Sequence, residues 1–145
     1  MKKLIILRGP SGSGKTTIAK TIVDTSQGRS VRHEADDFFH KDGPYNFDAS
    51  KLGQAHGHCQ SGVRASMASG TDTVIVSNTS MARWELNPYL ALAKEFGYDV
   101  KIYRVKGPWD AKLFASRNLH GVSEANIQKQ INKYQPLESE EEYVE

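Results

Sequence analysis

Short apolar runs alternate along the chain with segments whose apolar residues recur at helical spacing. The runs predict buried strands at 3–7, 31–34, 73–76 and 100–105. The periodic segments predict helices at 15–26, 48–70, 82–96, 109–118 and 123–134. Strands that alternate with helices favour a parallel sheet covered on both faces. The pattern therefore predicts an α/β fold with a mainly parallel sheet of four to five strands.

Several helix ends have recognisable capping residues. Asp48 and Ser123 are suited to cap the long second helix and the last helix. Gly70 is suited to end that same long helix, and Gly97 to end the 82–96 helix. The last two predicted helices would form a helical lid over a ligand. One face of the long helix carries an apolar stripe made of Leu52, Ala55, Cys59, Val63 and Met67.

Composition adds that the chain is an ordinary globular protein of one domain. It has 145 residues, of which 38% are hydrophobic and 25% charged. Its single cysteine excludes a disulfide within the chain, which fits a reducing compartment. Its apolar runs are far shorter than the ~18–20 residues that span a membrane, so we expect a cytoplasmic protein without a membrane partner.

The formal charge of +2 hides an uneven distribution. Residues 1–137, the predicted domain, hold all 19 bases and 12 of the 17 acids, which makes them +7. Residues 138–145 form an acidic C-terminal tail with five Glu, which we expect to be a solvated end that competes weakly for an anion-binding groove. The total charge of +2 excludes a histone-like nucleic-acid binder, but the charge of +7 on residues 1–137 allows a nucleic-acid substrate.

The strongest chemical signal follows the first predicted strand. Residues 9–16 match the Walker A pattern G-x-x-x-x-G-K-[ST] and open a helix, the context that supports a phosphate-binding P-loop. Lys15 would neutralise the β- and γ-phosphates of ATP or another NTP, and the Thr16 hydroxyl would hold Mg²⁺. The predicted nucleotide-binding residues are Gly9, Pro10, Ser11, Gly12, Ser13, Gly14, Lys15, Thr16, Thr17 and Arg117.

Two further polar clusters follow the second and third strands, where α/β sheets bind their ligands. Asp36 or Asp37 could accept a proton from a substrate hydroxyl, or could simply cap a turn. Residues 77–80 contain no acidic metal ligand, so Asn78 and Thr79 would form neutral hydrogen bonds to the acceptor or to water on Mg²⁺. Otherwise they merely cap the strand end.

Other candidates are weaker. Arg117 could bridge phosphate oxygens from the lid or could be a solvated helix-end residue. His56, His58 and Cys59 lack the spacing of a zinc site, and Cys59 is expected in the core. The aromatic residues near helix ends are expected to be packing groups: Trp84, Tyr89, Phe96, Tyr98 and Trp109.

Seven motifs in one order carry a resemblance over nearly all of residues 3–134: GPSGSGKTT, ADDFF, YNFDASKLGQAH, VIVSNT, WELNPYLALAKEFGYDV, PW and RNLHGVS. Together they resemble P-loop kinases related to phage-type 5′-polynucleotide kinases and the kinase domain of the metazoan Nedd-binding protein family, with phage and bacterial relatives, within an AAA-type ATP-binding family. The resemblance implies Asp36 as general base, Asn78 at an acceptor-side position and Arg117 in the lid.

The chain also departs from these relatives. Phe39 stands where the phage-type enzymes have a basic residue, and His40 or Lys41 could replace it. Ser77 and Ser123 stand where the metazoan relatives have Asp and Pro.

Three functions remain in competition. The first is an ATP-dependent kinase that phosphorylates the 5′-hydroxyl of DNA or RNA, with Asp36, Lys15 and Arg117 as catalytic residues and Asp36, Asp37, Asn78 and Thr79 on the acceptor side. The second is a kinase of a nucleoside, modified base or small metabolite. The third is a non-catalytic ATP-dependent binding module.

Overall fold

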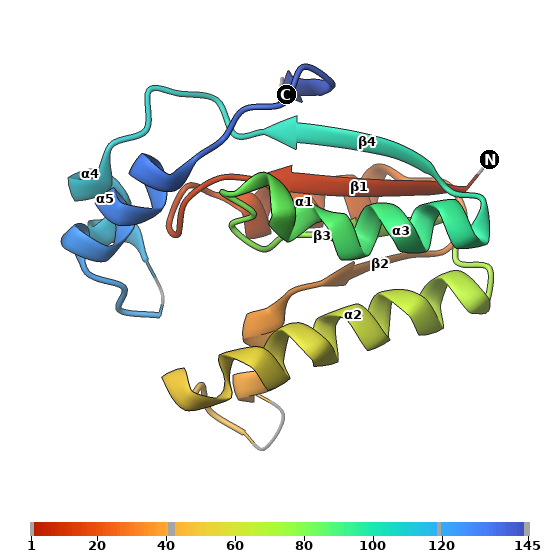
Figure 1. Ribbon diagram of the computed structural model, residues 1–145, viewed down its shortest axis with the longest axis horizontal. Coiled ribbons are helices and arrows are strands. Elements are labelled where there is room, and N and C mark those ends of the chain that lie inside the picture. Colours follow the sequence, from red (N-terminus) through yellow and green to blue (C-terminus); the bar gives the residue numbers. More distant parts are fainter. Residues whose placement is uncertain (1, 41–42, 119, 144–145) are drawn as a thin grey trace.

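The computed structural model describes residues 2–40, 43–118 and 120–143, and it contains one parallel sheet (Figure 1). Its five strands lie in the order β2-β3-β1-β4-β5. Their bounds are β1 Lys3–Arg8, β2 Ser30–His33, β3 Thr73–Val76, β4 Asp99–Arg104 and β5 Glu140–Glu142. The predicted α/β class and parallel sheet are therefore confirmed, and β1 to β4 end within one residue of the expected positions, whereas β5 lies in a segment for which no strand was expected.

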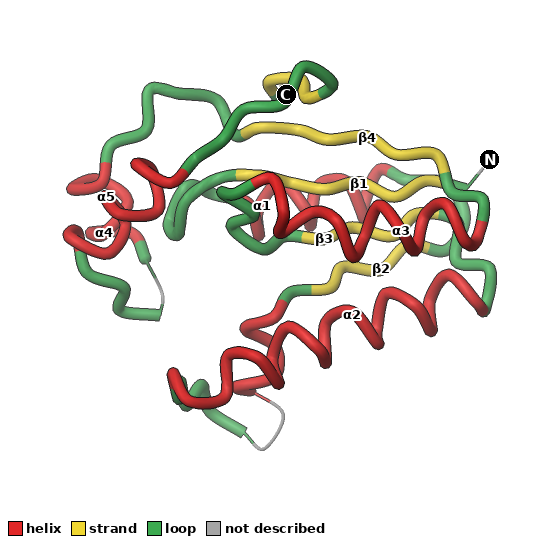
Figure 2. Tube along the Cα trace, in the orientation of Figure 1, coloured by secondary structure: helices red, strands yellow, loops and turns green. Residues whose placement is uncertain are grey.

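Five α-helices connect or follow these strands. They are α1 Lys15–Thr25, α2 Leu52–Ala68, α3 Asn87–Phe96, α4 Ala111–Arg117 and α5 Glu124–Lys133. Short 3₁₀ helices add η1 Ala35–His40, η2 Ala49–Lys51 and η3 Arg83–Leu86. The helices α4 and α5 pack together beyond the carboxyl ends of β1 and β4, where a lid was predicted (Figure 2).

The two sheet faces are covered by different helices, because successive strand residues point to opposite sides. Leu4 and Ile6 pack with α2 and α3 on one face. Ile5 and Leu7 pack with α1 on the other face. With both faces buried, β1 is apolar from Leu4 to Leu7, as expected for a central parallel strand.

Two helix predictions need correction at their starts. Asp48 does act as a cap, but its carboxylate accepts from Ser50 N at the start of η2, and α2 begins only at Leu52. Leu52 itself is exposed, unlike the other four members of the apolar stripe. Pro88 lies in the first turn of α3, so the predicted 82–96 helix divides into η3 and α3.

The acidic C-terminal segment differs from the expected solvated end. Residues Glu140–Glu142 pair in parallel with β4 as the edge strand β5. Glu140 forms an ion pair with the fully buried Arg8, and Glu142 pairs with Arg104. Two of the acidic side chains of this segment therefore form ion pairs with residues of the domain. A run of like charges in the sequence does not indicate such pairs.

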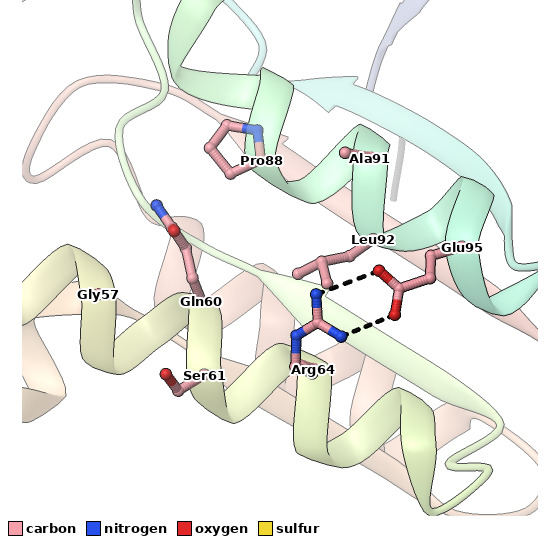
Figure 3. A pocket seen from close by; sticks show the side chains of 8 residues that line it. All are labelled: Gly57, Gln60, Ser61, Arg64, Pro88, Ala91, Leu92 and Glu95. Atoms are coloured by element: carbon pink, nitrogen blue, oxygen red, sulfur yellow. Dashed lines mark hydrogen bonds and ion pairs between the residues drawn. The ribbon is translucent and has the colours of Figure 1, made fainter.

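A shallow pocket of about 370 Å³ lies between α2 and α3 (Figure 3). Arg64 and Glu95 form a two-pronged ion pair across it. None of its eight lining residues belongs to the P-loop, to the Asp36–Asp37 pair or to the lid.

Within the described residues, the helices are all too short or too polar to cross a membrane.

Candidate active site

The P-loop connects β1 to α1 and is shaped by two glycines. Gly12 and Gly14 have φ of 79° and 103°, a conformation that other residues rarely adopt. A side chain at Gly12 would also meet the Phe114 backbone oxygen at 2.2 Å. The loop thus depends on glycine for its own turn and for close contact with α4.

Lys15 occupies the first position of α1 and is buried inside the loop. Its Nζ donates to the Pro10 carbonyl at 3.0 Å, so it points back across the loop where phosphates bind. Burial lowers the pKa of Lys15 to about 8, although the charges of Glu34 and Asp36 oppose this shift. The negatively charged oxygens of a bound phosphate would replace this carbonyl as the partner of Lys15 and would raise its pKa again.

This shifted pKa predicts a pH-dependent nucleotide affinity. Below pH of about 8, Lys15 is protonated in both the free and the bound protein, so it adds no pH dependence. Above that pH, binding requires proton uptake, and the affinity should fall by up to about tenfold per pH unit. Calorimetry in buffers with different ionisation enthalpies measures this uptake.

Lys15→Arg is the matched control, because its guanidinium stays charged across this range. It should bind more weakly yet remove the proton uptake. An identical uptake in both proteins would contradict the assignment to Lys15.

The lid contacts the P-loop at two places. Arg117 donates to the Gly12 carbonyl at 2.9 Å, and its guanidinium lies 5.0 Å from the centre of the Phe114 ring. The Gln130 side chain accepts from Ser11 N at 2.8 Å and donates to Ser11 Oγ at 3.1 Å. The structure therefore brings Arg117 to the loop, and it adds Gln130, which the sequence pattern did not single out.

Asp36 and Asp37 lie in η1, immediately after β2, and have different partners. Asp36 Oδ2 lies 3.2 Å from His120 Nδ1, and the Asp36 charge helps burial to raise the pKa of the nearby Tyr45 phenol. Asp37 Oδ1 lies 3.5 Å from the Arg32 guanidinium. Of these two aspartates, only Asp36 is among the groups whose charge acts on Lys15.

Glu34 is an acidic residue that the sequence analysis missed. Its carboxylate pairs with Arg32 at 2.6 Å and lies 3.4 Å from Ser77 Oγ at the end of β3. Burial raises the pKa of Glu34, while Arg32 and Lys15 counteract that shift. Residues 77–80 contain no acidic side chain, but Glu34, which directly follows β2, places a carboxylate next to them.

Asn78 and Thr79 make backbone contacts at the end of β3. Asn78 is buried, and its Oδ1 accepts from Ala35 N at 2.7 Å. Its Nδ2 donates to the Tyr89 hydroxyl at 3.3 Å. Thr79 accepts from Gly9 N through its carbonyl. These contacts fix the chain beside Asp36 and at the start of the P-loop.

The remaining expectations are mixed. Cys59 is buried, as predicted, whereas His56 and His58 are exposed. Among the described residues, no three His, Cys, Asp or Glu side chains gather as a metal site.

The aromatic residues expected to pack give different results. Tyr89 and Tyr98 are buried packing groups, but the packing prediction is wrong for Trp84, which is 66% exposed. Phe39 is buried, His40 lies beside Tyr45, and Lys41 falls outside the described residues.

The donors present fit a magnesium nucleotide. Thr16 is exposed in the first turn of α1, and the Glu34 carboxylate lies on the same side of the site as Lys15. A hydroxyl, a carboxylate, phosphate oxygens and water are the hard oxygen ligands that Mg²⁺ prefers. Ser13 Oγ is buried without a protein partner in the described structure, which leaves a donor turned into the loop.

The parallel sheet, the P-loop and the helical lid together define a P-loop protein of the kinase type. The chain belongs to the AAA domain family, whose model matches residues 4–137. It is 35% identical over 135 residues to the human NEDD4-binding protein 2. This match covers 91% of the chain but only 8% of that relative.

Solved structures have the same fold. A chain of the Pnkp1/Rnl/Hen1 RNA repair complex matches with a TM-score of 0.71 and 22% identity, over 91% of this chain and 43% of that one. A sugar kinase from Janibacter sp. matches with a TM-score of 0.66 and 21% identity, over 99% and 85% of the two chains. The same fold is thus present in a sugar kinase and in a chain of an RNA repair complex.

Proposed function

We propose that this chain is an ATP-dependent kinase that transfers the γ-phosphate to the 5′-hydroxyl of a polynucleotide. The observation that carries the proposal is the position of Asp36. It lies at the carboxyl end of the sheet, next to Lys15 and partly exposed, with its carboxylate facing the lid. Such a carboxylate is suited to accept the proton of an attacking hydroxyl.

Three residues have separate roles in the proposed reaction. Asp36 takes the proton from the 5′-hydroxyl oxygen as that oxygen attacks the γ-phosphorus. Lys15 stabilises the charge on the β- and γ-phosphates, and Arg117, already at the Gly12 carbonyl, contributes a second positive charge. The ADP oxygen leaves on the opposite side of the phosphorus.

Mg²⁺ would be held by Thr16 and, through the same oxygen-rich site, by Glu34. When bound, it supplies charge neutralisation across the β- and γ-phosphates. Arg32 fixes the Glu34 carboxylate at 2.6 Å, so this acid is oriented before any ligand arrives.

Two observations support a polynucleotide acceptor. The body of the chain carries a formal charge of +7, and exposed bases lie on or next to the lid: Lys106, Lys112, Arg117 and Lys129. One structural neighbour belongs to an RNA repair complex. A basic surface next to a phosphate-transfer site suits an acceptor that has phosphates of its own.

A small-metabolite kinase is the second candidate, because the sugar kinase structure matches almost the whole chain. The two candidates differ in salt dependence. Phosphate contacts with a strand make oligonucleotide affinity fall steeply with salt, whereas a neutral sugar leaves few counterions to release.

A panel of acceptors tests the proposal. Initial rates with labelled ATP are compared for 5′-hydroxyl DNA and RNA oligonucleotides, nucleosides, sugars and sugar acids, each at low and moderate salt. We expect the oligonucleotides to have the highest kcat/KM, with KM increasing with salt. Efficient labelling of a sugar with no labelling of any oligonucleotide would contradict the proposal.

A further inference from the structure

Two aromatic rings from distant parts of the chain stack directly beside Asp36. Tyr45 lies in the loop between η1 and α2, and His120 lies between α4 and α5. Their ring centres are 4.0 Å apart and their planes differ by 4°. Both side chains are only partly buried, so the pair lies at the surface of the site.

One of these residues also contacts the proposed base directly, and the other lies within its electrostatic reach. His120 Nδ1 lies 3.2 Å from Asp36 Oδ2, and the Asp36 carboxylate acts on the Tyr45 phenol. Burial, together with the Asp36 charge, raises the pKa of Tyr45 to about 12, so the phenol remains a donor at neutral pH. His120 therefore lies against both the Asp36 carboxylate and the Tyr45 ring.

The loop that carries Tyr45 is anchored to η1. Asn46 N donates to the Phe39 carbonyl at 3.0 Å. The buried Phe39 ring also meets the Tyr45 ring edge-on, with centres 6.1 Å apart. This support keeps the Tyr45 ring in place beside Asp36, so the ring can serve as a platform.

His120 fills the two positions that a nucleoside end would need. A reacting hydroxyl must come within about 3 Å of the base, which is where His120 Nδ1 lies. A flat ring stacked in parallel at 4.0 Å is the arrangement that nucleobases adopt on aromatic side chains. A sugar or sugar acid could fill the first position but has no flat ring for the second.

We infer that Tyr45 is the stacking platform for the terminal nucleobase of the acceptor, and that His120 occupies this platform until the acceptor displaces it. This inference rests on the proposed function and specifies its substrate: a 5′-hydroxyl end that carries its base. Stacking uses the face of the ring, which all bases share, so the platform accepts any base.

The test compares two 5′-hydroxyl oligonucleotides that differ only in whether the first nucleotide carries a base. Equilibrium binding is measured for each without ATP, and phosphate transfer is measured separately. Wild type should bind the base-bearing end about 5- to 150-fold more tightly than the abasic end. Tyr45→Leu should remove this preference, whereas Tyr45→Phe should keep it, because the ring remains.

Two further variants complete the design. Trp84→Leu changes an exposed ring that does not touch the platform and should retain the preference. His120→Ala should tighten binding of the base-bearing end, because nothing has to be displaced from the platform. Selective weakening by His120→Ala would overturn the displacement step.

The outcomes separate the two claims. An unchanged preference in Tyr45→Leu, or no preference in wild type, overturns the stacking role. A wild-type preference in binding without phosphate transfer overturns the proposed kinase activity and leaves the platform standing.

Discussion

Asp36→Asn is expected to lower phosphate transfer by about 10²- to 10⁴-fold, the usual contribution of a positioned general base. The amide keeps the size of the side chain and can still bond to His120, but it cannot take a proton from the acceptor. ATP affinity should change little, since the P-loop is intact. Single-turnover rates measure the transfer step, and calorimetry with an ATP analogue measures binding.

Asp37→Asn is the comparison variant, because it removes the neighbouring carboxylate of the same turn. Asp37 interacts with Arg32 at 3.5 Å rather than with the Tyr45 and His120 pair. Its loss should act mainly on acceptor KM and much less on the transfer rate. Equal damage by the two variants, or an active Asp36→Asn protein, would show that Asp36 is not the base.

Arg8→Met is expected to produce the largest loss of stability, about 3–5 kcal/mol. Arg8 is fully buried and donates to the Ser80 and Met81 carbonyls, each at 2.8 Å, and to Glu140. Its replacement leaves the Glu140 carboxylate with Arg104 at 3.8 Å as its remaining cationic partner. Denaturant unfolding measures the change, which is a large share of the ~5–15 kcal/mol that stabilises a typical domain.

Arg104→Met is the matched control at the more exposed end of the same cluster. Its pair with Glu142 at 2.7 Å is partly solvated, so we expect a loss of about 0.2–1 kcal/mol. Adding Glu140→Leu to Arg8→Met should recover part of the lost stability, because no unpaired buried charge is left. Equal losses in the two single variants would contradict the assigned role of Arg8.

Much of this architecture follows from local patterns in the sequence. The 73–76 run is apolar because both sheet faces are covered, and its bounds agree with the structure. The Walker A spacing identifies Gly14, whose φ is positive, whereas Gly12 lies at a variable position of the pattern and its positive φ is seen only in the structure. The apolar run and the Walker A pattern depend on neighbouring residues and are therefore visible in a single sequence.

The features that were missed depend on pairing between distant residues. Glu34 becomes important only because β2 ends beside β3 and Lys15. Glu140 reads as one of a run of acids, yet it pairs with Arg8 because the C-terminal segment returns to β4. Deleting residues 138–145 would therefore remove a partner of a buried arginine, and it would not isolate the effect of tail charge.

The central claim is that Asp36 directs the γ-phosphate onto a polynucleotide 5′-hydroxyl. One measurement tests it most directly: a single turnover with labelled ATP, excess protein and a 5′-hydroxyl oligonucleotide, followed by location of the label. We expect label at the 5′ end of the oligonucleotide, released by a phosphatase and reduced about 10²- to 10⁴-fold in Asp36→Asn. Label found only in free phosphate, or at the 5′ end to the same extent in both proteins, would contradict it.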